Sequence, residues 1–342
     1  MSRGRAPPPN VDELFAPPPE AEGRFRRHLI AALGFSLGHS DVIGLAVSGG
    51  PDSMALLTLT AAVLPGRCMA ATVDHRLREG SADEAAMVAR HCAAIGVPHI
   101  ILTPDHPIIG SSLQARAREV RYRLLAHWAA AAQLRAVATA HHLDDQAETF
   151  LLRAGRGSGI SGLAGIRVRQ HIDDMLVVRP LLGWRREALA ELVRDVPHVH
   201  DPSNANERFD RTRVRRVLAP DGPIDVGGVA RSAAILAQTD DDLRALIAML
   251  WDERASSPSP GIVDLRIDRL PYQARRNLTQ RALATVRAEA GIASPGFGEA
   301  TSIEPLLARL ALGETATQAG VIIKVRARAT WRFSPAPPRR AH

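Results

Sequence analysis

The sequence predicts an α/β protein with a doubly wound parallel sheet, followed by a smaller, mainly helical C-terminal region. Between residues 24 and 200, short apolar runs of strand length alternate with longer runs of helical character, which is typical of parallel sheets covered by helices. Charged and polar residues gather directly after the apolar runs, at the edge where such sheets bind ligands. Beyond residue 225 this alternation ends and long amphipathic segments dominate.

Size and charge narrow the class of protein. A length of 342 residues predicts two domains, and a hydrophobic fraction of 46% is enough for true cores. The formal net charge of +7 suits a polyanionic partner such as RNA. A compositional bias of the gene explains this charge equally well, because Lys324 is the only lysine and the other basic residues are arginines.

The chain is expected to divide at the Pro- and Gly-containing stretch 220–223, which predicts a linker. The expected parts are a disordered Pro-rich tail at 1–22, a catalytic domain at 23–218, a mainly helical accessory domain at 225–334 and a tail at 335–342.

Nothing in the sequence indicates export or a membrane. There is no signal peptide and no apolar run long enough to span a bilayer, so a cytoplasmic protein without a membrane partner is expected. Cys68 lies in a strand-like run and Cys92 in a helix-like run, without CxxC spacing. Both are expected to be small core residues in a reducing cytosol.

The elements of the first domain follow from stop and cap signals. Pro65-Gly66 and Gly96-Val97-Pro98 end helices, and Ser111 or Ser112 caps another. The expected strands are 42–47, 68–73, 99–102, 136–140 and 175–182. The expected helices are 24–37, 54–63, 79–95, 112–132, a segment that starts near 143, and 185–194.

The C-terminal region carries weaker signals. Amphipathic helices are expected at 226–255 and 272–290, with a short strand-like stretch at 262–267 between them. Residues 321–333 predict a closing strand or hairpin. No catalytic constellation occurs after Arg216.

The first polar cluster joins the strand at 42–47 to the following helix. Two glycines let the backbone approach an anion, and the unpaired N–H groups at a helix start point toward it, so a nucleotide phosphate site is predicted. Its residues are Ser48, Gly49, Gly50, Pro51, Asp52 and Ser53. The alternative is a plain turn in which serine or aspartate caps the helix. A Walker NTPase is excluded, because no Gly-Lys-Ser/Thr sequence occurs.

Two further clusters follow strand ends. Asp74 and His75 begin a charged loop. Taken alone, this loop is interpreted as a solvated turn; because it follows a strand end beside the first cluster, it is predicted to contact the nucleotide. A helix that starts near residue 143 would bring Asp145 and Glu148 to one face, with His142 three residues before Asp145. Such carboxylates are costly to place together without a cation, so Mg²⁺ carrying the ATP phosphates is expected, with the histidine available to move a proton. The alternative is an ordinary helix start, where aspartate is favourable.

Arginines form the remaining candidates. Arg118 and Arg121 share one helix face and either reach a phosphate or form its solvated side; without further context the sequence favours the solvated side. The four glycines between 157 and 165 predict a close-approach loop or a hinge. A dense basic run predicts phosphate or RNA contact rather than only a solvated helix face, through Arg208, Arg211, Arg213, Arg215 and Arg216.

Together these motifs resemble a known family. Ser48–Ser53 matches Ser-Gly-Gly-x-Asp-Ser, which resembles the pyrophosphate loop of the N-type ATP pyrophosphatases. The ordered set over residues 24–218 is similar to the tRNA(Ile)-lysidine synthetase family. The motifs that carry this likeness are Ser48–Ser53, Asp74-His75-x-Leu77-Arg78, Arg118-x-x-Arg121-Tyr122, His141-His142-x-Asp144-Asp145-x-x-Glu148-Thr149, Arg156-Gly157-Ser158-Gly159-x-x-Gly162-Leu163, Arg179-Pro180-Leu181 and Asp201-x-Ser203-Asn204.

The resemblance implies an adenine-nucleotide α-hydrolase-like fold and a ligase that forms a C–N bond. ATP adenylates the C2 oxygen of the wobble cytidine in a CAU-anticodon isoleucine tRNA and pyrophosphate leaves. The amine of L-lysine then attacks C2 and displaces AMP. The resemblance allows a homodimer, and it implies a tRNA-binding role for the C-terminal region.

The resemblance also suggests roles for individual residues. Asp52 and Asp145 are expected to hold Mg²⁺ or position the base, and His142 to move a proton. Arg211 and Arg215 are expected to stabilise the α-phosphate or hold the anticodon stem. The expected catalytic set is Asp52, Asp145, His142, Arg118 and Arg215.

Two departures and three alternatives accompany this interpretation. Arg76 stands where the family has glycine, so a different backbone is expected there, and the segment after Lys324 is short.

A tRNA thiolase that makes 2-thiocytidine or 2-thiouridine needs cysteines near the site, and Cys68 and Cys92 lack that spacing. A small-molecule ligase fits the basic charge poorly. A non-catalytic RNA-binding paralogue is disfavoured by the intact Ser48–Ser53 motif and Asp144-Asp145.

Overall fold

The computed structural model describes residues 19–77, 80–110, 113–199, 210–219, 222–298, 301–327 and 329–337, without the side chains of Pro19 and of residues 210–212. Several predicted features therefore lie outside the described residues. These are most of the N-terminal tail, Arg78, the cap at Ser111 or Ser112, the Asp201-x-Ser203-Asn204 segment, Arg208, the Arg211 side chain, part of the 220–223 linker and the end of the C-terminal tail.

The chain forms two compact units, Met1–Gln238 and Thr239–His342. The division falls inside helix α10 (Val226–Arg254), whose first half belongs to the first unit and whose second half belongs to the second. Among the described residues, no helix combines the length and apolar character needed to cross a membrane.

The first unit is built on a six-stranded sheet with the order β3-β2-β1-β4-β6-β5. Five strands are parallel and β5 is antiparallel to β6, which confirms the predicted parallel α/β sheet. The strands are β1 (Ile43–Ala46), β2 (Cys68–Val73), β3 (His99–Leu102), β4 (Ala136–Ala138), β5 (Arg169–Ile172) and β6 (Met175–Val178). The β5–β6 hairpin was not expected, because β5 is polar and exposed and carries no apolar run.

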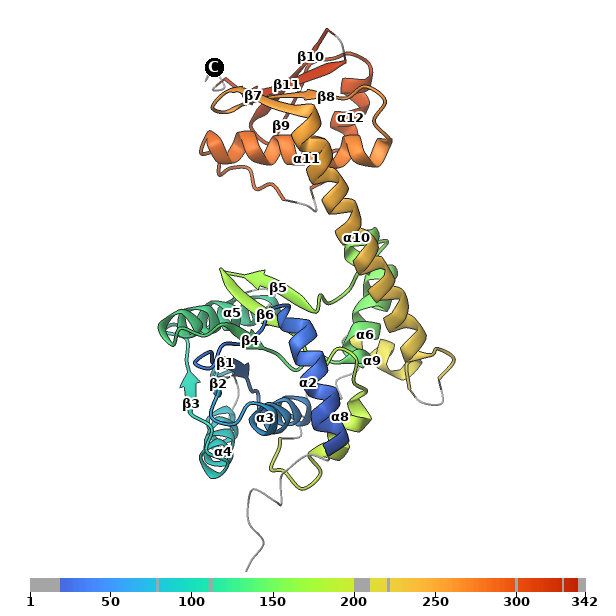
Figure 1. Ribbon diagram of the computed structural model, residues 1–342. Helices are drawn as coiled ribbons and strands as arrows, with labels where there is room; N and C mark the ends of the chain where they lie inside the picture. Colours follow the sequence, from blue (N-terminus) through green and yellow to red (C-terminus); the bar gives the residue numbers. More distant parts are fainter. Residues whose placement is uncertain are drawn as a thin grey trace, which may run out of the picture. The chain divides into compact units, whose positions relative to one another are not determined.

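Helices lie on both sides of this sheet (Figure 1). The helices of the first unit before α10 are α2 (Pro19–Leu33), α3 (Pro51–Val63), α4 (Ser81–Ala94), α5 (Leu113–Ala131), α6 (Leu143–Ala154), α7 (Ile160–Leu163), α8 (Arg186–Leu192) and α9 (Asp210–Val217). One core joins α2, α3, α4 and α8 to the sheet through residues such as Ile43 and Leu45. A second core joins α5 to the strands through Val137 and Val177. Burial on both faces explains why the strands are continuous apolar runs rather than alternating ones.

The strand order reverses at β1, which lies between β2 and β4. Parallel strands present their carboxyl ends at one edge, and ligands bind outside the point where the order reverses. The loops after β1, β2 and β4 carry the three polar clusters that the sequence singled out, so the fold brings them to this edge.

The second unit is a five-stranded antiparallel sheet with the order β7-β8-β11-β10-β9. Its strands are β7 (Ala255–Ser259), β8 (Ile262–Arg266), β9 (Ala316–Gln318), β10 (Val321–Arg326) and β11 (Thr330–Pro335), and its helices after α10 are α11 (Tyr272–Glu289) and α12 (Glu304–Ala311). Figure 1 shows α11 and α12 against the sheet.

The prediction of a mainly helical C-terminal region was therefore wrong. The missed strands are β7 and β9, which are short and mostly exposed and so carry no hydrophobic alternation. Strands with such alternation were predicted from the sequence. In β11, for example, Trp331 and Phe333 are buried while Arg332 between them is not. A single core joins this sheet to its helices.

This core gives a test of the second unit. Leu283 of α11 is fully buried, so Leu283→Ala is expected to lower the free energy of unfolding by about 2–5 kcal/mol through the cavity that it leaves. Native-state hydrogen exchange of the α11 amides measures this change. Leu312→Ala is the matched control, because Leu312 is 77% exposed and its truncation should change the exchange free energy by less than about 0.5 kcal/mol. Equal effects of the two substitutions would contradict the described core.

Candidate active site

The loop between β1 and α3, called here the glycine loop (Ser48–Ser53), has the geometry of an anion site. Gly49 adopts φ +88°, and a Cβ there would lie 3.3 Å from Val88 and 3.4 Å from Val199, so both conformation and space favour glycine. Pro51 is in the first turn of α3, where its missing N–H costs nothing. The helix start therefore presents its backbone N–H groups at the sheet edge.

Hydrogen bonds within the glycine loop fix its shape. The Ser48 N–H donates to Ser53 Oγ at 3.1 Å, and Ser53 Oγ donates to the Gly50 carbonyl at 2.9 Å. The Val199 N–H donates to the Gly49 carbonyl at 2.8 Å, which ties a distant segment to the loop. A preformed loop presents its N–H groups to a phosphate without further ordering.

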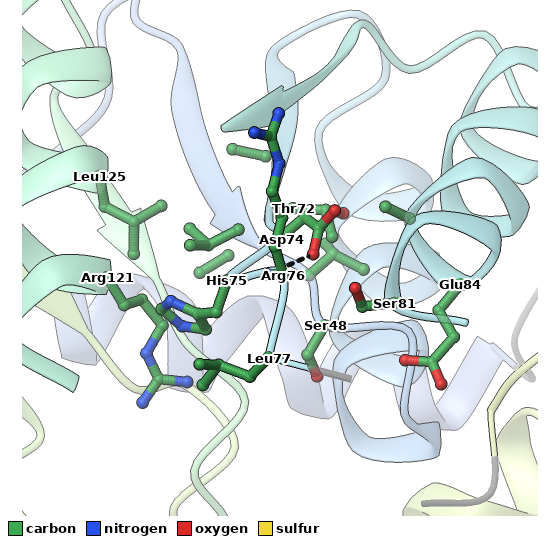
Figure 2. Close-up of a pocket in the computed structure, with 15 residues that line it drawn as sticks. Ser48, Thr72, Asp74, His75, Arg76, Leu77, Ser81, Glu84, Arg121 and Leu125 are labelled. Atoms are coloured by element: carbon green, nitrogen blue, oxygen red, sulfur yellow. Dashed lines mark hydrogen bonds between the residues drawn. The ribbon is translucent and has the colours of Figure 1, made fainter. Parts of the chain in front are cut away.

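A cavity of about 230 Å³ lies beside the glycine loop, at the ends of β1 and β2. Figure 2 shows Arg121 and Leu125 of α5 on one side and Ser81 and Glu84 of α4 on the other. The cavity is also lined by Ser48, Asp74 and His75, which were predicted to contact the nucleotide. Its size and its mixture of apolar and polar walls suit a nucleoside, with the glycine loop at its rim for the phosphates.

Arg76 keeps a left-handed backbone. Its φ is +53°, and its N–H donates to Asp74 Oδ1 at 2.9 Å. A glycine adopts this conformation readily, so the arginine does not change the turn but is held in it by the buried Asp74 carboxylate. The expectation of a different backbone at this position finds no support in these angles.

The centre of the site is His142, which caps α6 and is 1% exposed. Its Nε2 lies 3.4 Å from Asp52 Oδ2 and 3.5 Å from Asp145 Oδ2, and its Nδ1 lies 3.5 Å from Asp144 Oδ2. The fold thus joins the predicted residues Asp52, Asp145 and His142 into one group, called here the acid cluster together with Asp144.

Electrostatics make His142 a cation. Burial lowers its pKa, but the contacts with Asp144 and Asp52 and the charge of Asp145 outweigh burial and raise the pKa to about 9. The Asp144 carboxyl is also buried, yet its contacts with His142 and with the Arg186 N–H hold its pKa well below its usual range. Burial and the nearby Glu148 carboxylate raise the pKa of Asp145 despite its contact with His142.

Asp145 also closes the start of α6. Its Oδ2 accepts the His142 N–H at 3.1 Å, which satisfies a backbone donor at the helix N-terminus. The alternative interpretation, in which aspartate only caps the start of a helix, thus describes one of the two contacts of Asp145. The other contact belongs to the acid cluster, because the same Oδ2 lies beside the His142 ring.

Two arginines contact Asp144 of the acid cluster, and a third contacts the nearby Glu148. The Arg186 N–H donates to Asp144 Oδ2 at 2.8 Å, and Arg185 Nε donates to Asp144 Oδ1 at 3.3 Å. Glu148, which is 2% exposed, accepts bonds from Arg186 Nη2 at 3.0 Å and from Arg215 Nε at 2.8 Å. The predicted residue Arg215 of α9 therefore contacts the buried Glu148, while Arg213 and Arg216 of the same helix are exposed.

Arg185 and Arg186 were not predicted from the sequence as residues of the site. They stand at the start of α8, where the helix dipole disfavours cations, so two arginines there indicate nearby carboxylates. Arginines at a helix N-terminus were therefore the sequence feature that could have identified these two site residues.

The neighbouring residue His141 is neutral. Burial and the positive charges of Arg179, Arg118 and Arg121 hold its pKa well below its ordinary value. Its Nδ1 lies 2.9 Å from Thr139 Oγ1. The predicted residue Arg118 is exposed, as the solvated-face interpretation predicts, and its guanidinium lies over the Tyr122 ring.

The glycine-rich segment at 157–165 is a close-approach turn around α7. A Cβ on Gly165, whose φ is +68°, would lie 2.5 Å from Gln146 Oε1. That oxygen accepts the Ile166 N–H at 2.6 Å, and Gln146 Nε2 donates back to the Ile166 carbonyl at 3.2 Å. The turn is thereby fixed to α6, the helix that carries the acid cluster.

Comparisons with known proteins agree with this geometry. A family model described as a PP-loop domain matches residues 24–221. The tRNA(Ile)-lysidine synthase of Novosphingobium aromaticivorans is 41% identical over 311 residues, which cover 90% of this chain and 92% of that protein. The enzyme of the same name from Zymomonas mobilis is 39% identical over 307 residues, covering 88% and 90%.

Among solved structures, the U34-tRNA thiolase NcsA of Methanococcus maripaludis with its [4Fe-4S] cluster superposes with a TM-score of 0.53. The sequence identity is 16%, over 64% of this chain and 79% of that chain. At this identity the likeness shows a shared fold.

The buried Glu148 carboxylate gives a first test of the site. Glu148→Gln removes the charge that Arg186 and Arg215 share, so the free energy of unfolding should fall by about 2–4 kcal/mol. Urea denaturation measures the change. Glu191→Gln is the control, because its ion pair with Arg194 is exposed and should contribute no more than about 0.5 kcal/mol. A loss for Glu148→Gln no larger than for the control would exclude a buried ion-pair network.

The pKa of His142 gives a second test. Because the folded-state pKa is raised from 6.5 to about 9, protonated His142 stabilises the fold fully below about pH 6.5, and this stabilisation is lost as the pH rises through about 9. The difference corresponds to about 3 kcal/mol. Unfolding free energies measured between pH 6 and 10 without divalent cations should show this fall in the wild type and not in His142→Gln. Parallel pH profiles for the two proteins would contradict a protonated His142.

Proposed function

The chain belongs to the tRNA(Ile)-lysidine synthase family of PP-loop, ATP-dependent enzymes, and from this premise we propose how its residues divide the reaction. The substrates are ATP, L-lysine and an isoleucine tRNA with a CAU anticodon. The observation that carries the proposal is the acid cluster, which includes Asp52 near the end of the glycine loop and is joined to α6 by the contact of Asp52 with His142.

Adenylation comes first. The adenosine occupies the cavity lined by Asp74, His75 and Arg121, and the phosphates lie on the N–H groups of the glycine loop. The C2 oxygen of the wobble cytidine attacks the α-phosphorus, the new P–O bond forms, and pyrophosphate leaves. The cytidine must first leave its stack, which costs a few kcal/mol and is easiest in a loop.

Asp52 and Asp145 fit a Mg²⁺ ion that accompanies ATP. Asp52 Oδ1 is buried and has no hydrogen-bond partner among the described residues. In the described part of the chain, no group of three or more His, Cys, Asp and Glu side chains is arranged to hold a metal. Mg²⁺ needs only one or two protein carboxylates when substrate phosphates and water complete its shell. When bound, the ion neutralises phosphate charge.

Ligation comes second. The amine of lysine attacks C2 of the adenylated cytidine, the C–N bond forms, and AMP leaves with the former C2 oxygen. The amine must lose a proton, and the carboxylates of the acid cluster are the bases available at this point of the site. The carboxylates of the acid cluster also attract a cationic lysine side chain.

A sulfur-transfer reaction is disfavoured by the cysteines. Cys68 and Cys92 are buried and free, and burial raises their pKa values to about 11 and about 12. Thiols with such pKa values stay protonated and unreactive at neutral pH. The cysteines of this chain therefore favour lysine transfer over the tRNA thiolase alternative.

The direct test follows labelled lysine into RNA. The purified protein is incubated with ATP, Mg²⁺, labelled lysine and a CAU-anticodon isoleucine tRNA transcript. Label should enter the tRNA, and it should not enter a transcript in which the wobble cytidine is uridine. Release of AMP without lysine transfer would retain adenylation and refute lysine as nucleophile.

The role of Asp145 is tested by substitution. Asp145→Asn removes a proposed metal ligand and a carboxylate of the acid cluster, and kcat/KM for lysine transfer should fall by roughly 100- to 1,000-fold. Asp195→Asn, at an exposed position after α8, is the matched control and should act as the wild type does. Full activity of Asp145→Asn would remove this residue from the mechanism.

A further inference from the structure

The turn between β6 and α8, called here the tryptophan turn (residues 179–185), joins the N-terminal helix α2 to the acid cluster. Trp184 in this turn is 3% exposed, and its backbone and side chain contact different helices. Its carbonyl accepts the N–H of Leu143, the first residue of α6, at 2.9 Å. Its indole Nε1 donates to Nδ1 of His28, in α2, at 3.1 Å. One residue therefore connects α2 to the helix that carries the acid cluster.

Two residues of α2 hold the tryptophan turn. The Arg24 guanidinium lies 4.2 Å from the centroid of the Trp184 ring, and Arg24 Nη2 donates to the Gly183 carbonyl at 2.7 Å. The His28 and Trp184 rings meet edge to face, with centroids 6.2 Å apart. Arg24 and His28 share one face of α2, because they are one helical turn apart. The turn is thus fixed both through its backbone and through the indole.

The hydrogen bond from Trp184 requires a neutral His28. A protonated histidine has two donors and no acceptor, whereas the neutral ring offers one nitrogen as an acceptor. Burial and the charge of Arg24 lower the pKa of His28, so its Nδ1 can accept the indole proton at neutral pH. Without this acceptor a buried indole N–H would be left unsatisfied, which is costly. The hydrogen bond also fixes the orientation of the indole, which burial alone does not.

The two residues that follow Trp184 set the position of Asp144. The Arg186 N–H donates to Asp144 Oδ2 at 2.8 Å, and Arg185 Nε donates to Asp144 Oδ1 at 3.3 Å. The same Oδ2 lies 3.5 Å from His142 Nδ1. Hydrogen bonds weaken steeply as their angles change, so a displaced Trp184 would weaken the contacts that its neighbours in the chain make with Asp144. Asp144 thus depends on the orientation of the indole, and His142 depends on Asp144.

We propose that Trp184, oriented by His28 and Arg24, is a positioning residue for lysine transfer. It acts through Asp144 on the acid cluster. Among the described residues, those that line the nucleotide cavity do not include Trp184, so its orientation should affect the rate of the reaction and not the binding of ATP. This inference rests on the proposed function, and it gives the N-terminal helix a part in the reaction.

The test combines two substitutions at the indole contact. His28→Leu removes the acceptor, and Trp184→Phe keeps a ring in the core but removes the donor. Each should lower kcat for lysine transfer roughly tenfold, because a displacement of about 1 Å in a site costs up to about 100-fold. The KM values for ATP and tRNA should change by less than about twofold. The double variant should be no slower than the slower single variant, because both substitutions remove the same hydrogen bond.

A conservative variant and a matched control separate position from stability. His28→Asn places an amide oxygen close to the position of Nδ1 and should restore kcat to within about threefold of the wild type. Ile43→Val removes a methyl group from the core that also contains Trp184 and leaves the indole contact intact. Its kcat per folded molecule should equal that of the wild type. The folded fraction is measured by circular dichroism under the assay conditions.

The indole N–H gives a readout that does not depend on activity. Its exchange with solvent, followed by nitrogen–proton NMR, should be slow in the wild type and in His28→Asn, and faster in His28→Leu. The chain has 4 tryptophans, and Trp184→Phe assigns the signal.

Three results would overturn the inference. Wild-type kcat in His28→Leu or in Trp184→Phe would show that the reaction does not need the contact. Effects that multiply in the double variant would show that the two residues act separately. A raised KM for ATP with unchanged kcat would assign the contact to nucleotide binding. If the wild type transfers lysine and one of these results is obtained, only this inference fails. If the wild type transfers no lysine to the tRNA, the proposed function fails and this inference fails with it.

Discussion

The active-site edge depends on one buried cation among carboxylates. His142 is almost wholly removed from solvent, yet Asp52, Asp144 and Asp145 surround it closely enough to keep it protonated. Three carboxylates at this spacing would repel one another without such a charge. The imidazolium therefore joins two loops that are distant in sequence, the glycine loop after β1 and the start of α6 after β4.

Hydrogen bonds from neighbouring elements position the acid cluster. The Leu143 N–H at the start of α6 donates to the Trp184 carbonyl at 2.9 Å, and the next two residues along the chain, Arg185 and Arg186, hold Asp144. Trp184 is in turn fixed by α2. Its Nε1 donates to His28 Nδ1 at 3.1 Å, and the Arg24 guanidinium lies over its ring. The N-terminal helix thus supports the acid cluster without touching it.

Charge divides the edge of the sheet into regions with different tasks. The acid cluster suits a cationic lysine and a metal-bound polyphosphate. Positive charge lies next to it, where Arg179, Arg118 and Arg121 act on His141. His141 is next to His142 in sequence but has the opposite pKa shift, because the effect of burial is reinforced by neighbouring arginines and not offset by aspartates. Two adjacent histidines thereby acquire different charges from their surroundings alone.

Much of this was predictable from the sequence, for reasons that particular residues make plain. The apolar strands and the glycine loop are local patterns, so the parallel sheet and the grouping of Asp52, His142 and Asp145 at its edge could be predicted. The ion pairs of Arg186 and Arg215 with Glu148 could not be predicted, because they join residues 38 and 67 positions apart and depend on the packing of α8 and α9. The antiparallel sheet of the second unit was missed where polar edge strands carry no hydrophobic period.

The most direct test of the central charge is the protonation state of His142 itself. Nitrogen NMR of histidine-labelled protein, without nucleotide or divalent cation, reports whether both ring nitrogens carry protons. The structure predicts an imidazolium at pH 7.5 that titrates with a pKa of about 9, and His142→Gln assigns the signal. A neutral His142 ring at pH 7.5, with a pKa at or below 6.5, would contradict the role of this residue as the cation that organises the site.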